Sequence, residues 1–183
     1  TPSRSSAASD VYKRQTYASK KFKSKSLERY KEKIRFIKMY EISLMSQSDL
    51  KEAYEIEKTT NPTPWSKENF FSSFEVGHKS LACKYNKRIV GFIIFSHIKK
   101  ESHLLSIAVE KDHQRSGAGS ILLKTMINQS KVLGAKKIYL EVRSKNKVAI
   151  NFYSKFKFIK DAIRTNYYSG DSPDDAVLMS LDI

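Results

Sequence analysis

From Met39 onward, apolar residues recur at two different spacings. Alternation of apolar and polar residues, or a short continuous apolar run, predicts strands, whereas apolar residues three and four positions apart predict helices. Read in this way, the chain predicts the element order βααβββαβαββ. The strands that the pattern bounds best are 40–44, 79–85, 89–97, 103–109 and 136–142.

Capping and breaking residues bound the predicted helices. Ser48 is the expected N-cap of the first helix, which runs through Glu57 before the Asn61–Pro64 segment breaks the chain. A second helix follows Trp65, and Gly134 is expected to end a longer third helix. A fourth helix is expected to open at an asparagine cap, and its apolar stripe consists of Ala149, Phe152, Tyr153 and Phe156.

The chain order also predicts how strands pair. Asn86-Lys87 is typical of a hairpin turn between strands 79–85 and 89–97, because asparagine tolerates positive φ. Strand 103–109, the long helix and strand 136–142 form a crossover, which requires parallel pairing. On the last of these strands one face is apolar and the other polar: Ile138, Leu140 and Val142 against Tyr139, Glu141 and Arg143.

Residues 1–38 differ from the rest of the chain. Ser5–Gln15 looks like the in-frame translation of a transposon-type sequencing adapter, and residues 16–38 are rich in lysine without a sustained apolar face. We therefore interpret residues 1–38 as a non-native or disordered leader and residues 39–183 as a single domain. The leader has 12 Lys/Arg against 3 Asp/Glu and so supplies +9 of the net charge of +15, which leaves +6 for the domain. A basic nucleic-acid-binding arm is therefore disfavoured.

The cysteine content and the length of the apolar runs indicate in which cellular compartment the protein is expected. Cys83 is the only cysteine, so an internal disulfide is excluded, and the sequence contains no Cys/His cluster typical of a metal site. The longest strongly apolar run, Ile89–Phe95, is far shorter than the ~20 residues of a membrane helix. We expect a soluble, cytoplasmic protein without a membrane anchor.

Residues Gln114–Leu123 read Q-R-S-G-A-G-S-I-L-L and join a predicted strand to a predicted helix. Gly117 and Gly119 lack a Cβ, so the backbone can turn tightly there and the first helical N–H groups can face an anion, beside the charge of Arg115. Neither the lysine of a P-loop nor the third glycine of a dinucleotide fingerprint follows. On spacing alone, a phosphate-binding loop and an ordinary loop entering a helix are equally good interpretations.

Two residues carry candidate chemistry. Glu141 lies at the end of a predicted central strand, where ligands gather in α/β sheets. Taken alone, Glu141 is better explained as an exposed carboxylate or a partner of Arg143, and Tyr153 as a core residue.

Several longer motifs change that balance. The loop fits Q/R-x-x-G-x-G/A at Gln114–Gly119, and Leu140–Phe158 reads L-E-V-R-x-x-N-x-x-A-I-x-x-Y-x-x-x-x-F. Together with the following motifs, this pattern resembles the GNAT acetyltransferases, and within them the RimI-type ribosomal-protein alanine N-acetyltransferases, over nearly all of residues 39–183. The further motifs are P-W-S at 64–66, G-F at 91–92, I-A-V at 107–109, R-x-N-Y-Y at 164–168 and D-A-x-x-M at 175–179.

The resemblance implies an α/β (α+β) GNAT fold: a mixed, mostly antiparallel twisted sheet with one parallel pair, 103–109 with 136–142, and helices on both faces. It implies acetyl-CoA as acetyl donor, no metal, and a ribosomal-protein N-terminus as acceptor, with nucleic acid at most an indirect partner; we expect a monomer. Glu141 is implied as the base that deprotonates the amine, and Tyr153 as the acid that protonates the departing thiolate. The implied donor-binding residues are Ile107, Ala108, Val109, Arg115, Ser116, Gly117, Ala118, Gly119, Ser120 and Asn146.

Three positions depart from the family pattern. Ser120 replaces a basic residue, Lys157 stands where glycine is usual at the end of a helix, and His113 replaces a Tyr or Phe. Two alternatives remain open: a GNAT enzyme acting on a small amine or a lysine side chain, and a catalytically silent acyl-CoA-binding or RNA-associated module. Acceptor choice is expected to lie in residues 62–74 and 166–175.

Overall fold

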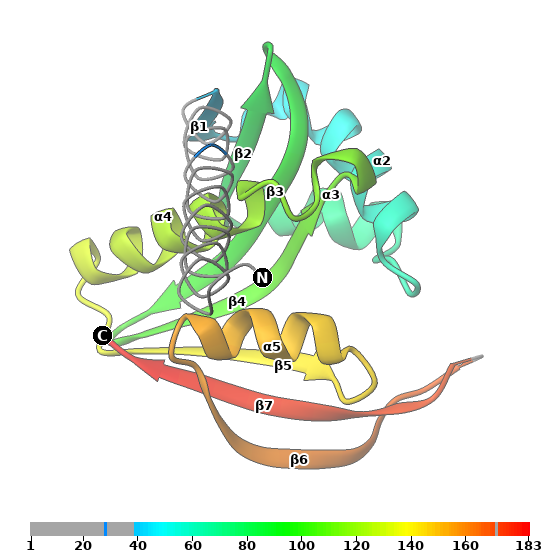
Figure 1. Ribbon diagram of the computed structural model, residues 1–183, viewed down its shortest axis with the longest axis vertical. Helices are drawn as coiled ribbons and strands as arrows, with labels where there is room; N and C mark the ends of the chain where they lie inside the picture. Colours follow the sequence, from blue (N-terminus) through cyan, green and yellow to red (C-terminus); the bar gives the residue numbers. More distant parts are fainter. Residues whose placement is uncertain (1–27, 29–38, 171) are drawn as a thin grey trace, which may run out of the picture. The chain divides into compact units, whose positions relative to one another are not determined.

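The computed structural model describes Glu28, residues 39–170 and residues 172–183, so the predicted leader lies outside the described residues except for Glu28. The elements follow the predicted order (Figure 1). The strands are β1 (Tyr40–Leu44), β2 (Lys79–Tyr85), β3 (Arg88–Ile98), β4 (Glu101–Val109), β5 (Lys137–Arg143), β6 (Ile159–Tyr168) and β7 (Asp174–Asp182). The helices are α2 (Leu50–Thr60), α3 (Lys67–Glu75), α4 (Ala118–Val132) and α5 (Lys147–Lys155), with 3-10 turns at η1 (Gln47–Asp49) and η2 (Lys111–His113).

The described strands form one sheet in the order β1-β2-β3-β4-β5-β7-β6. Strands β4 and β5 pair in parallel, and every other pair in this sheet is antiparallel. The predicted mixed, mostly antiparallel sheet with one parallel pair is therefore confirmed. Strand β5 lies in the interior of the sheet, between β4 and β7, as the crossover predicted.

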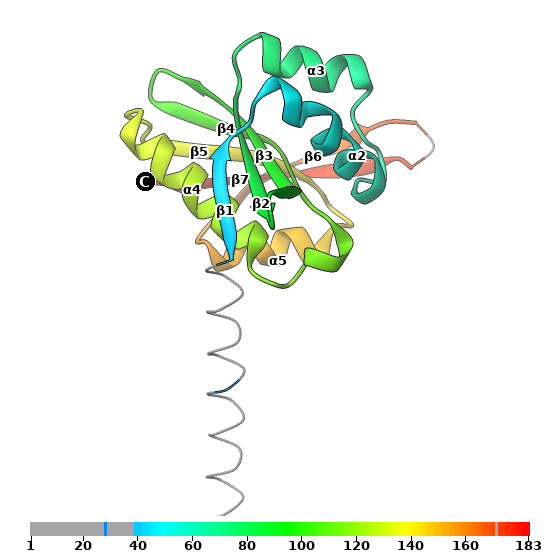
Figure 2. The same cartoon turned by 90° about the horizontal axis from the view of Figure 1, so that it is seen from above.

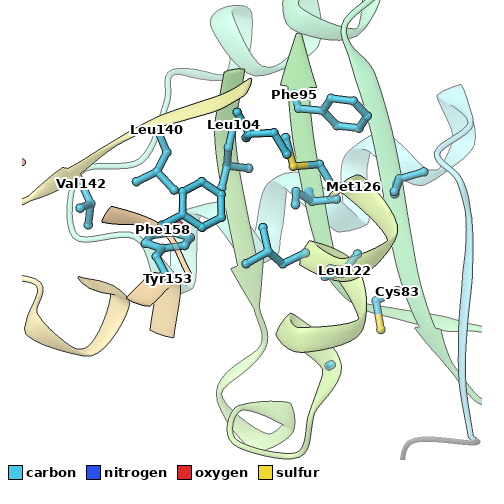
Figure 3. Close-up of a cluster of buried hydrophobic side chains, with 14 of the residues drawn as sticks. Cys83, Phe95, Leu104, Leu122, Met126, Leu140, Val142, Tyr153 and Phe158 are labelled. Atoms are coloured by element: carbon cyan, nitrogen blue, oxygen red, sulfur yellow. The ribbon is translucent and has the colours of Figure 1, made fainter. Parts of the chain in front are cut away.

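Helices cover both faces of the sheet (Figure 2). Helices α2 and α3 pack on one face, where Phe70 and Phe92 are fully buried. On the other face, α4 and α5 enclose a second core that contains Leu122, Met126 and Tyr153 (Figure 3). Each helix thus buries one apolar stripe against the sheet, which is the main favourable contribution to folding. The described helices are all too short or too polar to cross a membrane.

The two parallel strands separate halfway along β4. Pairing with β5 runs from Glu101 opposite Lys137 to Leu104 opposite Leu140 and stops there. At this point β4 carries one extra residue, Leu105, relative to β3, because Ile94 pairs with Ser106 and Phe95 with Leu104. A bulge of this kind bends a strand and increases its twist. Beyond the bulge, β4 is paired with β3 only, and its other edge has no strand partner in the described part of the sheet.

Local turn chemistry explains one success and one error of the sequence analysis. Asn86 and Lys87 have φ of 49° and 66°, as the two central residues of a tight hairpin turn require, so the predicted turn is confirmed. The predicted cap at Ser48 is wrong. Ser46 instead forms a capping box with Asp49 over the 3-10 turn that precedes α2.

Lys157, which takes the usual glycine position just after helix α5, has a φ of 70°, in the left-handed region that glycine favours. Its N–H bonds to the Ser154 carbonyl at 3.0 Å, and the Phe158 N–H bonds to the Tyr153 carbonyl at 3.2 Å. We expect Lys157→Gly to raise the free energy of unfolding by roughly 1 kcal/mol, because glycine adopts this conformation without a Cβ clash. Chemical denaturation measures it. Lys155→Gly, two residues earlier within the helix, should be destabilising instead, and equal effects of the two variants would exclude the left-handed cap.

Candidate functional site

The free edge of β4 comprises Ile107, Ala108 and Val109, the last three residues of the strand. Their pairing partners on β3 are Ile93, Phe92 and Gly91. Because every strand has two edges of backbone N–H and C=O groups, one edge of this segment has no strand partner. On this edge the Val109 carbonyl accepts from Gln114 Nε2 at 3.0 Å, and the other backbone groups remain available for hydrogen bonds to a bound molecule. An extended ligand with amide groups fits such an edge as an added strand would.

The Gly-rich loop follows β4 and leads into α4. Arg115 and Gly117 have φ of 60° and 108°, so the chain turns through two left-handed residues before the helix starts at Ala118. Gly117 is the N-cap and supplies no side-chain oxygen. The Ala118 N–H lies 3.5 Å from Ser116 Oγ, and the next N–H groups of the first turn remain for a ligand. A Cβ added at Gly119 would lie in ordinary van der Waals contact, 3.6 Å from Val109 Cγ2 and 3.8 Å from Phe152 Cζ. The arrangement fits an anion at the start of α4.

Side-chain hydrogen bonds hold the Gly-rich loop against β1. The Tyr40 hydroxyl donates to Ser116 Oγ at 2.8 Å and lies 3.0 Å from His113 Nδ1. Ser116 Oγ in turn donates to the His113 carbonyl at 2.5 Å. The predicted donor-binding residue Ser116 therefore has its side chain bound within the protein, and only its backbone remains for a ligand. His113, one of the three departures from the family pattern, takes part in holding the loop to β1.

Glu141 lies on the α2/α3 side of the sheet, because it alternates with Leu140 and Val142, which are buried on the α4/α5 side. Its carboxylate accepts a hydrogen bond from Arg164 Nη1 at 2.8 Å. The Tyr167 hydroxyl also bonds to it, and this bond raises the pKa of Tyr167. The alternative pairing with Arg143 is not observed. Glu141 is an exposed hydrogen-bond acceptor held by two side chains of β6.

Tyr153 lies on the opposite side, in the core between α5 and the sheet, beside Phe158 at a ring-centroid distance of 5.8 Å (Figure 3). Burial raises the pKa of its phenol, with a smaller contribution from Tyr168. The hydroxyl makes no hydrogen bond to another described residue. It is therefore a protonated phenol that is free to donate to a bound molecule.

Tyr168, at the end of β6, interacts electrostatically with both candidates. Burial raises its pKa, followed by the negative charge of Glu141, and Tyr168 in turn contributes to the raised pKa of Tyr153. Glu141 and Tyr153 themselves lie on opposite sides of the sheet. Asn146 lies just past the end of β5 and caps α5 through its Oδ1, which accepts from the Ala149 N–H at 3.0 Å, so its predicted capping role is confirmed.

Sequence reasoning missed Glu57, which is 1% exposed. Its Oε1 accepts from Asn61 Nδ2 at 2.8 Å and from the Trp65 N–H at 3.2 Å, and its Oε2 accepts from Ser106 Oγ at 3.3 Å. This carboxylate ties the end of α2 to the α2–α3 loop and to β4 next to the bulge. The signal was present, because a glutamate on the apolar face of a helix needs partners when buried.

Among residues 39–170 and 172–183 no group of three or more His, Cys, Asp or Glu side chains has the arrangement of a metal site.

Comparison with known proteins gives one consistent family. Residues 50–158 match the model of the acetyltransferase (GNAT) family, which uses acetyl-CoA. The chain is 35% identical to the ribosomal protein bS18-alanine N-acetyltransferases of Salmonella typhimurium and Escherichia coli K12, over 79% of this chain and 99% of each relative.

Solved structures agree with this result. The crystal structure of the E. coli ribosomal-protein-S18-alanine N-acetyltransferase superposes with a TM-score of 0.75 at 35% identity, over 79% of this chain and 94% of that one. Ard1 from Thermoplasma volcanium superposes with a TM-score of 0.73 at 26% identity, over 79% of this chain and 98% of that one. The diverging parallel strands, the uncapped start of α4 and these similarities lead to one conclusion: the chain belongs to the acetyltransferase (GNAT) family.

Proposed function

We propose that this protein transfers the acetyl group of acetyl-CoA to the α-amine of an N-terminal alanine, with ribosomal protein bS18 as the acceptor. The observation that carries the proposal is a free strand edge that runs, in continuous chain, into a helix start without a side-chain cap. The first feature suits an amide-bearing arm and the second suits a pyrophosphate. Acetyl-CoA has both groups in this order.

The donor-binding roles follow from that fit. Residues 107–109 would bond the pantetheine arm through the free edge of β4. Residues 115–120 would hold the pyrophosphate, through backbone N–H groups and the charge of Arg115. The Asn146 amide, whose Oδ1 caps α5, retains its Nδ2 donors for the same molecule.

The two candidate chemical groups act on opposite partners of the reaction. The neutral amine forms a bond to the acetyl carbon, the carbon–sulfur bond breaks, and the proton lost by the amine passes to Glu141, directly or through a water. The Tyr153 phenol gives a proton to the departing thiolate. Glu141 faces the α2/α3 side of the sheet and Tyr153 faces the α4/α5 side. Glu141 therefore takes the proton of the acceptor amine, and Tyr153 gives a proton to the sulfur of the donor.

The acceptor assignment rests on the relatives, whose names specify the alanine of ribosomal protein bS18. The single cysteine predicts a reducing compartment, which suits a ribosomal-protein acceptor.

A peptide panel tests the acceptor. The purified chain is incubated with acetyl-CoA and peptides that begin with alanine, serine, methionine or proline but are otherwise identical, and with an amine-blocked peptide that has an internal lysine. Mass spectrometry then locates the added acetyl group. We expect it on the α-amine of the alanine peptide. Preferential acetylation of the lysine, or of a small amine in a parallel reaction, would contradict the proposal.

The phosphate-binding role of the loop has its own test. We expect Gly117→Val to weaken acetyl-CoA binding by at least roughly tenfold, because the residue has a φ of 108° that a β-branched side chain opposes. Isothermal titration measures the affinity. Val132→Gly, at the exposed far end of the same helix, is the control for a general disturbance of α4 and should leave the affinity unchanged. An unaltered affinity of Gly117→Val would refute the role of the loop.

A further inference from the structure

Arg143, the last residue of β5, contacts three separate segments. Its Nη1 donates to the Ser172 carbonyl oxygen at 2.7 Å, and its Nη2 donates to Thr63 Oγ1 at 2.9 Å. Its guanidinium carbon also lies 4.2 Å from the ring centroid of Tyr168. A planar guanidinium can donate from two nitrogens in its plane while its flat face stacks on a ring, and an ammonium group lacks this rigid planar fork.

Thr63 and Ser172 belong to the two loops expected to govern acceptor choice, between α2 and α3 and between β6 and β7. Each loop has anchors of its own. Glu57 holds the first, and in the second the Asp174 carboxylate accepts from Ser144 Oγ at 2.7 Å and from the Lys145 N–H at 3.1 Å. Within residues 39–170 and 172–183, the bond from Arg143 to Thr63 is the one hydrogen bond that joins the α2–α3 loop to the C-terminal half of the sheet.

We propose that Arg143 is a positioning residue that clasps these two loops together, so that an acceptor peptide meets one preformed surface instead of two independent loops. The inference rests on the proposed function, because it assigns a role on the acceptor side of that site. Arg143 lies two residues after Glu141 on the same face of β5, so the clasp is next to the proposed base. The donor-binding residues are on β4, the start of α4 and the cap of α5, and the contacts of the Arg143 side chain with described residues do not include them.

If Arg143 clasps the two loops, its replacement should weaken the binding of the acceptor peptide and leave the binding of acetyl-CoA unchanged. We expect R143K, which keeps the charge but loses the fork and the stack, to raise the KM for the alanine peptide roughly tenfold, as the loss of a charged hydrogen bond does. The dissociation constant of acetyl-CoA and the melting temperature should stay close to wild type. R88K is the matched control, because Arg88 is an exposed arginine whose two guanidinium bonds go to Glu110.

A double-variant cycle tests whether the effect passes through Thr63. T63V removes the hydroxyl and keeps the shape, and we expect it to raise the same KM roughly threefold in the wild-type background. In the R143K background it should have no further effect, because the bond is already lost. If the two effects multiplied as independent changes, or if R143K weakened acetyl-CoA binding in parallel, the clasp would be wrong.

The single tryptophan of the chain, Trp65, closes the α2–α3 loop and reports on it without any substrate. We expect R143K and T63V to increase the quenching of Trp65 fluorescence by acrylamide, and R88K to leave it unchanged. If the wild-type chain acetylated no peptide while R143K still increased quenching, the proposed acceptor would be wrong and the clasp would stand. If the peptide were acetylated but R143K altered neither KM nor quenching, the clasp would be refuted and the proposed function would stand.

Discussion

Replacing Glu141 by glutamine is expected to slow acetyl transfer roughly 10²-fold at neutral pH, with much of the loss recovered under alkaline conditions. The α-amine of a peptide has a pKa of about 7.7–8.0, so much of the acceptor is protonated at pH 7 and must lose a proton before attack. Glutamine keeps the shape of the side chain and can still accept the hydrogen bond from Arg164 through its amide oxygen. The variant therefore removes basicity and leaves the ion-pair geometry of β5 and β6 largely in place.

Initial rates between pH 6.5 and 9.5, at saturating acetyl-CoA, measure this recovery. Glu55→Gln is the matched control, because Glu55 is an exposed carboxylate on α2 whose one ion pair with a described residue is to Lys58. A loss of the same size at every pH would mean that Glu141 orients the acceptor and does not take its proton. Full activity of the variant would remove Glu141 from the mechanism and leave proximity as the main source of catalysis.

Tyr153→Phe is expected to lower the rate by roughly 10²- to 10³-fold, and raising the pH should not restore it. Burial raises the pKa of this phenol above the ordinary value for tyrosine, so in the wild type it remains protonated through neutral and mildly alkaline pH. Loss of the hydroxyl forces the thiolate to depart without a proton, and a higher pH makes that proton scarcer. The defect should thus persist or deepen where that of Glu141→Gln fades.

The fold should tolerate the change, because the Tyr153 hydroxyl makes no hydrogen bond to another described residue and the ring is kept. Acetyl-CoA affinity and melting temperature are expected to stay near wild type. Tyr139→Phe is the control for loss of a phenol on the neighbouring strand, where Tyr139 stacks on His103 at a centroid distance of 5.3 Å. Identical pH profiles for the Glu141 and Tyr153 variants would refute the division into base and acid.

Features set by neighbours in the chain were predictable from sequence. The limits of β1 and β2 are confirmed to the residue, because apolar runs and turn residues delimit them. The Asn86-Lys87 turn, the Asn146 cap and the left-handed Lys157 depend on backbone geometry within a few residues. The parallel pairing of β4 with β5 followed from chain order and the handedness rule alone.

Contacts between residues that are far apart in the sequence could not be predicted from it. Arg143 meets Thr63 across 80 positions of sequence, and no local pattern encodes that pairing. The partner of Glu141 proved to be Arg164, because β7 separates β5 from β6 and long side chains reach over it. The error at Ser48 was local, and it arose because a 3-10 turn precedes α2 and moves the capping box two residues back, to Ser46.

Because β4 has a bulge at Leu105, the number of residues in this strand decides which side chains face the donor side of the sheet and which face the acceptor side. Side chains alternate along a strand, so one residue more or fewer between Ser102 and Ala108 would turn every later side chain to the opposite face. Ser106 would then point away from Glu57, and Ile107 would leave the core that holds Tyr153. In this segment a substitution changes one contact, whereas a single-residue insertion or deletion would exchange the donor and acceptor sides of the sheet.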